Sequence, residues 1–437
     1  MLESVTNFGL PTSSMNAIST HKENPVLLNK NIGLVKKLFL ICGLFGTLLV
    51  LLFAPLLSKL TFSTIEYYWI FILLSSTMFF NQMYAGNFVV LQALRVNKSI
   101  AKVTLLSSTV SLSLVIPLYF YFRNDAIVPG IIITSFFLFY FSAREVKKNN
   151  IQYQRISNNI LLTDGKKILK IGFVISIANI ITLATSYYLR VFINAEDGFE
   201  AVGLYNSGFA MLNTYVGLVF SAMALDYYPR LSEASNNSEK INLMVNEQGE
   251  IAILILGPIL IIFILFLKYL IIILYSSAFV PIVPMLLWSS VGIIIKSTNW
   301  CLGYFLLAKA DSKVYFISET ISNLTFVIIS VIGYKIMKFD GLGYAFTISN
   351  LITLIQLIVI VKYRYKFRFT YDLKKYFFIQ TLFVLGIIFV SKTLTGGIYY
   401  VASLFLFSIS FIFSYFSFTE NSSSFQLVNR IKDRIFK

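Results

Sequence analysis

The sequence predicts an all-α, polytopic integral membrane protein, and three observations carry this prediction. Hydrophobic residues make up 57% of the 437 residues, charged residues make up only 13%, and the mean hydropathy is +0.77. A soluble domain carries roughly 25% charged residues, so this chain lacks the polar surface that a water-soluble globule needs. The apolar residues are continuous over stretches of about twenty, which suits helices across hydrocarbon, whereas the strands of a barrel would alternate with period two.

Twelve stretches are long enough to cross a hydrocarbon core about 30 Å thick. They cover residues 38–58, 67–92, 103–121, 127–143, 172–192, 201–225, 251–275, 284–308, 314–334, 341–361, 376–391 and 398–418. Residues 1–20 are mildly apolar and contain Pro11, and they are too short and polar to span alone. They also lack the basic and apolar regions of a signal peptide.

The distribution of Lys and Arg predicts the orientation, because cytoplasmic loops are enriched in these residues. With the loop 21–37 inside, the inner segments hold 28 of the 36 Lys and Arg residues, and the outer segments hold 5. The outer loop at 193–201 has neither and carries Glu196, Asp197 and Glu200 instead. We therefore expect the C-terminus to be cytoplasmic, and we attribute the net charge of +16 to these loops rather than to nucleic-acid binding.

Several functional classes are excluded by the residues that are missing. Cys42 and Cys301 both lie in apolar stretches, where reduced core thiols are expected, and His21 is the single histidine. No metal-binding spacing and no histidine-based triad can be built from these residues. The sequence also lacks a GxxxxGK[ST] loop. We expect no cofactor and no metal, so the energy for any transport would come from an ion gradient or a product gradient.

The N-terminal part of the sequence partly matches the C-terminal part when the two are aligned with a shift of 213–214 residues. In this register, residues 18–20 fall on 231–233, the apolar stretch 38–58 falls on 251–275, and residues 87–98 fall on 301–312. The order of spans, loops and basic residues is kept, which favours parallel repeats related by an axis along the membrane normal. Chance is the alternative, because apolar spans resemble one another easily.

Residues 1–20 then correspond to the inner half of a second helix. The first helix of the second repeat, at 172–192, has no counterpart in the first repeat, which also lacks the outer half of its second helix. We therefore expect a reading frame truncated at its 5′ end by roughly 40–60 residues. The predicted organisation is an N-terminal lobe at 1–143, a cytoplasmic linker at 144–171 and a C-terminal lobe at 172–362. An extra two-span hairpin and a basic cytoplasmic tail follow at 363–437.

Three stretches carry a resemblance to a known family. One is ALDYYPRLSE at 224–233, and another is LYSSAF at 274–279, followed by Trp288. The last runs from Lys296 through Trp300, Gly303 and Tyr304 to 308–310, and then to Phe316 and Glu319. Together with the two repeats of six spans, they resemble the Wzx-type O-antigen flippases of the polysaccharide transporter family, within the multidrug/oligosaccharidyl-lipid/polysaccharide exporter superfamily.

This resemblance implies a MATE-like fold of two helical lobes and transport rather than catalysis. The expected substrate is an undecaprenyl-diphosphate-linked oligosaccharide of O-antigen or another surface polysaccharide, moved across the bacterial inner membrane by alternating access. A polysaccharide polymerase and a chain-length regulator are the implied protein partners. Two alternatives stay open: a multidrug exporter of the same superfamily, and a membrane-embedded polysaccharide polymerase.

Lys296 is the leading candidate for substrate binding. It lies near the middle of the span 284–308, too far from either end for its side chain to reach water easily. A cation at this depth normally faces a cavity or an ionic partner, so Lys296 would attract the diphosphate or acidic sugars. The alternative is an ion pair that holds helices together. Asn299 adds polarity to the same span.

A polar stripe on the span 172–192 is the second candidate. Asn179, Thr182, Ser186 and Arg190 recur at helical spacing and would form one wall of a cavity, where Tyr187 would stack on sugars. The alternative for Arg190 is snorkelling to the outer interface.

Four further residues are candidates with simpler alternatives. Glu319 would titrate as a coupling carboxylate or form a structural salt bridge. Asp226 is a second candidate for coupling or ion pairing, and its simpler alternative is a local pair with Arg230. Arg95 and Lys309 occupy matching places in the two repeats and would steer anionic head groups at the cytoplasmic mouth, unless they only anchor the chain.

Overall fold

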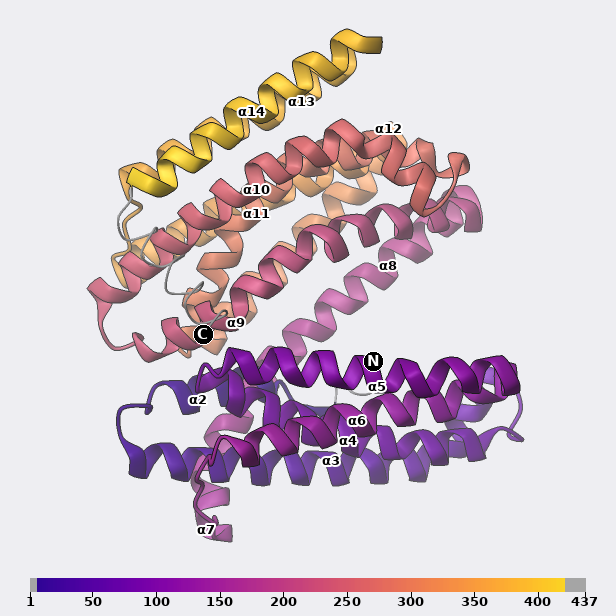
Figure 1. The fold of residues 1–437 in the computed structure, drawn as a ribbon, viewed down its shortest axis with the longest axis vertical. Coiled ribbons are helices and arrows are strands. Elements are labelled where there is room, and N and C mark those ends of the chain that lie inside the picture. The colour runs from indigo at the N-terminus through magenta and orange to yellow at the C-terminus, as the bar shows by residue number, and fades with distance from the viewer. Residues whose placement is uncertain (1–5, 421–437) are drawn as a thin grey trace. The chain divides into compact units, whose positions relative to one another are not determined.

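The computed structural model describes residues 6–420, apart from the side chains of residues 215, 216 and 420. Within this range it consists of helices and loops without a strand (Figure 1). The predicted all-α, polytopic fold is confirmed. Eight helical segments of the described residues are long and apolar enough to cross a membrane. The basic tail at 430–437 lies outside the described range.

Each of the twelve predicted spans coincides with a helix or a helix arm. The first four are α3 (Pro25–Phe62), α4 (Tyr68–Ala93), α5 (Asn97–Phe122) and α6 (Ile127–Lys148). The next two are the arms of α8 (Lys166–Ala210), the second continuing through the π-helix η3 (Met211–Val216) into α9 (Gly217–Glu233). The others are α10 (Ser238–Leu274), α11 (Val283–Ala308), the arms of α12 (Ser312–Tyr365), α13 (Tyr371–Thr393) and α14 (Gly396–Glu420).

Helices α8 and α12 are each broken by one residue with non-helical backbone angles. The break lies at Gly198 in α8 (φ 81°) and at Lys338 in α12 (φ 49°, ψ −125°). Beside the second break, Gly333 and Gly341 face each other so closely that a Cβ on either would overlap the backbone of the other. The two arms of α12 can meet there only because both residues are glycine.

The predicted internal repeat is visible in the backbone conformation. Non-glycine residues with positive φ are uncommon, and here six of them recur in three pairs whose spacing along the chain is nearly constant. The pairs are Arg95 with Ala310, Arg123 with Lys338, and Asn150 with Lys366. Arg95 thus corresponds to Ala310, so the predicted match of Arg95 with Lys309, and of 87–98 with 301–312, is wrong by one residue. Arg123 and Lys338 have nearly the same angles (φ 47°, ψ −120° and φ 49°, ψ −125°), and each ends a helix arm at the predicted outer side.

The starts of equivalent helices are capped in the same way. The side chain of Asn24 accepts hydrogen bonds from the amides of residues 26 and 27, at 3.1 and 3.2 Å, and starts α3. Asn237, its counterpart in the second repeat, accepts from residues 239 and 240 at 3.1 and 3.0 Å and starts α10. Helices α4 and α11 both have 26 residues. The second repeat therefore uses the elements of the first in the same order.

The chain divides into two compact units, Met1–Ile180 and Ile181–Lys437, which are described separately. In the first unit, α4 packs against α3 and α6, and α5 packs against α6 (Figure 1). The short helix α2 (Leu10–Ser19) packs against α3 and α4. Buried apolar residues from α4, α5 and α6 meet in one cluster: Leu91, Ile100, Val103, Phe141 and Val146.

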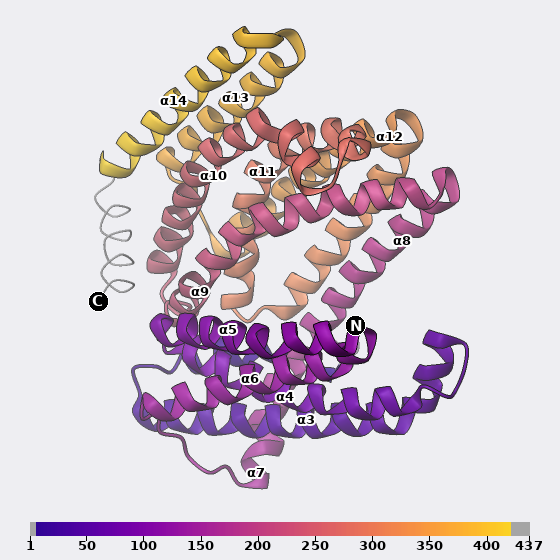
Figure 2. The ribbon, with the colours of Figure 1, turned by 45° about the vertical axis from the view of Figure 1, so that its right-hand side comes forward.

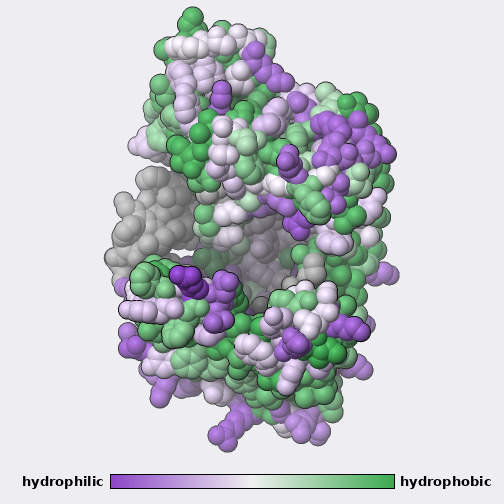
Figure 3. Space-filling model, turned by 90° about the vertical axis from the view of Figure 1, so that its right-hand side faces the viewer, coloured by the Kyte–Doolittle hydropathy of each residue, from purple (hydrophilic) through white to green (hydrophobic). Residues whose placement is uncertain are grey.

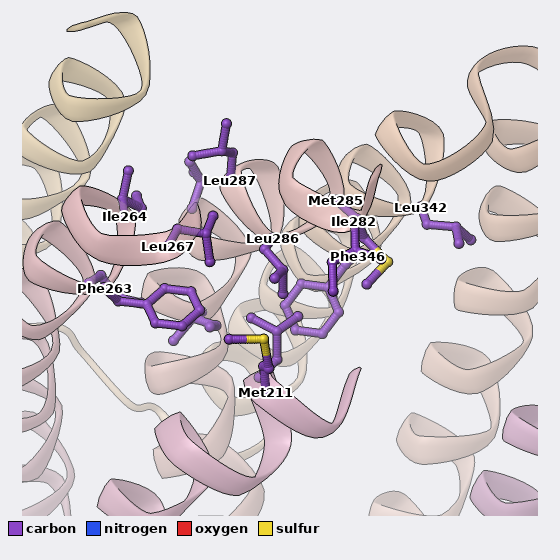
Figure 4. Packing of buried hydrophobic residues seen from close by; sticks show 14 of the residues in the cluster. Met211, Phe263, Ile264, Leu267, Ile282, Met285, Leu286, Leu287, Leu342 and Phe346 are labelled. Atoms are coloured by element: carbon purple, nitrogen blue, oxygen red, sulfur yellow. The ribbon is translucent and has the colours of Figure 1, made fainter. Parts of the chain in front are cut away.

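The core of the second unit is built around α10, α11 and α12. Helix α11 is buried along most of its length, and its apolar residues pack against both neighbours. Figure 4 shows Met211, Leu286 and Phe346 pointing toward one another from η3, α11 and α12. Apolar contacts, rather than charges, therefore hold most of this unit together.

The predicted extra hairpin is present as α13 and α14, which pack side by side against α10 (Figure 2). Gly257 of α10 allows the close approach of Gln380, whose amide group donates to Ser414 and accepts from Ser410, both at 2.8 Å. The outer face of the hairpin is apolar, with Leu382 and Phe405 both about two-thirds exposed (66% and 65%). Hydrophobic residues also cover broad areas of the surface in Figure 3. Lipid tails are the expected cover for such surfaces.

The glycine pair in α12 gives a first testable prediction. Replacing Gly341 by Val should lower the free energy of unfolding by about 1–3 kcal/mol, because the added side chain has no space beside Gly333. Thermal melting of the purified protein in detergent measures this loss. Gly203→Ala is the matched control, because nothing lies within 4 Å of a Cβ placed there. Equal melting temperatures for the two variants would contradict the close approach.

Candidate functional site

One narrow stripe of α11 is left open by the packing of the second unit. From Ser289 to Ala308, the residues that are not buried are Lys296, Trp300, Gly303, Tyr304 and Leu307. Their helical spacing places them on a single face of the helix. A Cβ placed on Gly303 meets nothing within 4 Å, so there is free space beside this face.

Lys296 is the first residue of this stripe and lies in the middle of its helix. Its ammonium nitrogen lies 5.7 Å from the centre of the Phe346 ring, which permits a cation–π contact. It also interacts electrostatically with Glu319 on the neighbouring arm of α12. The structure thus brings together two of the predicted charged candidates from two helices, both of them partly buried.

Asn323, one helical turn after Glu319, makes a polar contact between α12 and α8. The side-chain amide of Asn323 donates to the backbone oxygen of Glu319 at 2.8 Å and to the hydroxyl of Thr182 at 3.0 Å. Thr182 is one member of the predicted polar stripe on α8. A part of that stripe is therefore joined to the helix arm that carries Glu319.

The other members of the predicted stripe on α8 lie further apart. The guanidinium Nε of Arg190 donates to the amide oxygen of Asn206 at 2.8 Å, across the hairpin formed by the break at Gly198. Ser186 is partly buried and Tyr187 is exposed. Asn179 is exposed and belongs to the first unit, so it is not grouped with them.

Asn299 points away from the open stripe of α11. It is buried, and its amide nitrogen donates to the backbone oxygen of Asn350 at 2.9 Å and to the side-chain oxygen of Asn350 at 3.3 Å. This pair joins α11 to the second arm of α12. Sequence spacing could not distinguish this face from the open one, because polar residues occur on both.

The predicted cytoplasmic ends of the helices carry the remaining candidates. Asp226 and Arg230 form a salt bridge of 3.5 Å within α9, and Arg230 also contacts Gln248 of α10 at 3.4 Å. The ammonium group of Lys309 donates to the backbone oxygen of Ser235. Arg95 is partly buried in the first unit, at one of the paired positions with positive φ.

Asp311 is a functional candidate that the sequence did not single out. It accepts hydrogen bonds from the Arg364 guanidinium at 2.8 Å, from the Tyr365 hydroxyl at 2.7 Å and from the amide of Val314 at 3.3 Å. Burial alone would raise the pKa of Asp311, but these hydrogen bonds and the charge of Arg364 outweigh it and lower the pKa. This carboxylate connects the start of α12 to its end.

A second cluster of charges lies at the predicted outer ends of α8 and α12. Asp197 accepts from the Lys338 ammonium group at 2.8 Å and from the Tyr334 hydroxyl at 2.6 Å, and Glu196 lies 3.6 Å from Lys335. The acidic loop at 193–201 is the sequence signal for this cluster, but its basic partners could not be assigned without the fold. These contacts tie the two hairpin turns of the second unit together.

The described residues contain no candidate metal site and no disulfide. No group of three or more His, Cys, Asp or Glu residues that could hold a metal ion occurs among them. Cys42 and Cys301 are both free and buried. The open stripe of α11 presents a cation and two aromatic rings, which can attract an anion and stack against a ligand.

The fold is that of the MATE-type membrane transporters. The chain is similar to the crystal structure of a MATE point mutant, with a TM-score of 0.72, 16% identity and 86% of each chain covered. It is also similar to the Vibrio cholerae MATE transporter VcmN in the bent form (TM-score 0.70, 13% identity, 87% of this chain and 86% of the other). The lipid II flippase MurJ in its inward closed conformation has a TM-score of 0.57 and 16% identity over 96% and 90% of the chains. At these identities, the likeness concerns the fold alone.

Residues 29–284 match the family of polysaccharide biosynthesis proteins, and the chain belongs to this family. No curated protein sequence matches the chain. Together, the family and the fold describe a multi-pass membrane protein of polysaccharide biosynthesis with a MATE-like arrangement of helices.

Asp311 gives the second testable prediction. Asp311→Asn should lower the free energy of unfolding at neutral pH by about 1 kcal/mol, because it removes a charge that accepts three hydrogen bonds. The pKa of Asp311 is lower in the folded state, so its stabilisation is present above the unfolded pKa of about 3.9. It is lost as the pH falls through the folded-state pKa. The gap in melting temperature between wild type and variant should therefore shrink in acid.

Asp125→Asn serves as the control for this measurement, because Asp125 is an exposed carboxylate at the turn between α5 and α6. This variant should melt like the wild type at both pH values. A gap for Asp311→Asn that stays constant down to acid pH would refute the role given to its charge.

Proposed function

We propose that this chain is a flippase that moves an undecaprenyl-diphosphate-linked oligosaccharide from the cytoplasmic to the outer leaflet of the bacterial inner membrane. The oligosaccharide would be a repeat unit of O-antigen or of another surface polysaccharide. The protein would work by alternating access without catalysing a reaction, driven by an ion gradient or a product gradient. Its C-terminus would be cytoplasmic, and a polymerase and a chain-length regulator would act on the delivered product.

The observation that carries this proposal is the position of Lys296. It lies at the midpoint of α11, which runs from Val283 to Ala308. Either end of the helix is therefore roughly 18 Å away along the axis, a distance that a lysine side chain cannot cover. A cation placed this deep favours an anionic ligand, and the diphosphate of a lipid-linked sugar is the strongest anion in such a substrate.

A comparison of the two repeats argues against a purely structural role for this charge. In the register that places Arg95 on Ala310, Lys296 corresponds to Asn81 and Glu319 corresponds to Thr104. Helices α4, α5 and α6 thus form the equivalent bundle without either charge. The charges of the second repeat are an addition to the fold, and substrate handling explains why they are present.

The alternatives predict a different chemistry at this position. A multidrug exporter would need carboxylates without a deep cation, because most of its substrates are cationic. A polymerase would need an enzymatic site on a large outer loop, and the predicted outer loops are short. An anionic, lipid-linked saccharide better explains the family match and the open stripe around Lys296.

Lys296 gives the third testable prediction. In a flippase-deficient strain, the wild-type gene should restore the surface polysaccharide, whereas Lys296→Ala should reduce it about tenfold or more, because it removes the deep cation. Lys296→Arg should keep part of the activity because it keeps the charge. Immunoblots of surface polysaccharide and of membrane-inserted protein measure both quantities.

Two controls separate transport from folding. Lys268→Ala removes a lysine of α10 that is exposed on an apolar span, and it should leave the polysaccharide unchanged. The double variant Lys296→Ala with Glu319→Gln removes the pair together, which avoids a single uncompensated charge in the interior. A double variant that is stable and fully active would show that neither charge handles the substrate.

A further inference from the structure

Trp300 and Tyr304 are the two large aromatic residues on the open stripe of α11. They follow Lys296 at four-residue intervals, so the three side chains are stacked along one face, with about 6 Å of helix rise between neighbours. The two rings lie 5.1 Å apart at an angle of 74°. Both residues are partly exposed, while Cys301 and Phe305, which follow them in the chain, are buried.

The orientation of Trp300 is fixed from behind by buried aromatic residues of α9. Tyr227 is fully buried and stacks on Trp300 at 5.3 Å and 29°, while its hydroxyl donates to the backbone oxygen of Cys301 at 3.1 Å. Phe220 supports the same ring at 5.5 Å. Tyr304 is supported in the same way by the buried Tyr228, at 5.1 Å. The two exposed rings are thus held rigidly before any ligand arrives.

Gly303 leaves free space on the same face of α11, beside these rings. It is one position before Tyr304 and three after Trp300, and a Cβ placed there would meet nothing within 4 Å. A glycine inside a helix costs about 1 kcal/mol relative to alanine, and no close packing requires it here. Free space beside two fixed aromatic rings, next to a cation, is the arrangement expected of a binding surface.

The first repeat lacks this arrangement. In the register that places Lys296 on Asn81, Trp300 corresponds to Ala85, Gly303 to Phe88 and Tyr304 to Val89. Equivalent helices therefore pack without the aromatic pair and without the free space. As with Lys296, the feature is specific to the second repeat.

We propose that Trp300 and Tyr304 form a platform on which a sugar ring of the substrate stacks, with Gly303 providing the room for it. A pyranose ring has an apolar C–H face that packs against aromatic rings, and polar edges that stay hydrated. Lys296, one helical turn away, would pair with the anionic group linked to that sugar. This inference rests on the proposed flippase function and assigns the saccharide end of the substrate to one site.

Binding to two lipids tests this platform and separates it from the proposed function. The probes are undecaprenyl diphosphate and the oligosaccharide-bearing lipid isolated from bacteria in which this chain restores the surface polysaccharide. Each is titrated against the purified full-length protein in lipid nanodiscs. Trp300→Ala should weaken binding of the oligosaccharide-bearing lipid about tenfold and leave binding of undecaprenyl diphosphate unchanged. Lys296→Ala should weaken binding of both lipids.

Gly303→Leu keeps the test valid if Trp300→Ala disturbs folding. The Cβ of the new residue enters free space, and leucine has a higher helix propensity than glycine, so we expect the protein to fold while the sugar is blocked. Trp288→Phe is the matched control, because Trp288 is on the same helix but stacks on Tyr344 at 4.5 Å, away from the open stripe.

The binding experiment has three outcomes, and each supports or overturns the platform or the flippase function. Selective loss of the oligosaccharide-bearing lipid in both the Trp300 and Gly303 variants supports the platform. Unchanged binding, or equal weakening of the two lipids, overturns the platform while leaving the flippase function intact. A wild-type protein that binds neither lipid overturns the flippase function itself.

Discussion

A helix that crosses hydrocarbon must make its backbone hydrogen bonds internally, and this constraint determines where the chain can turn. The breaks in α8 and α12, at Gly198 and Lys338, both fall at predicted membrane surfaces, where water can hydrate the freed backbone groups. Contacts between the two turns, centred on Asp197, then hold them together. Within the spans, small residues such as Gly333 and Gly341 allow close packing, because the apolar lipid provides little driving force for helix association.

The same constraint makes any charge inside a span conspicuous. The second unit is held together by apolar packing, so Lys296 and Glu319 are not needed as its main stabilising contacts. They are costly unless they meet each other, a cavity or a ligand. Their electrostatic interaction across α11 and α12 offsets a part of this cost, and an anionic substrate that approaches Lys296 would compete with Glu319 for it. Substrate binding and the charge state of Glu319 would then be linked.

The sequence predicted the spans, the order of elements in the repeat and the extra hairpin correctly, because long apolar stretches and their spacing are direct consequences of the bilayer. The register of the repeat was wrong by one residue around Arg95. Lys296 and Glu319 could be singled out for the same reason, since charges within spans are rare. The faces of the helices were harder to predict. Asn299 is close to Lys296 in the chain but points to Asn350, and Asp311 finds its partners at the far end of α12. Such partners depend on which helices pack together, which periodicity does not reveal.

A direct repeat provides an internal comparison that a single bundle lacks. Both repeats satisfy the same demands of helix capping, turning and packing, as the caps at Asn24 and Asn237 illustrate. Features that the repeats share are therefore explained by the fold. Features found in the second repeat alone, such as Lys296, Trp300 and Gly303, are explained by something that the fold does not require. If the chain is the proposed flippase, its substrate would select for them, and divergence between the repeats would then mark the binding surface.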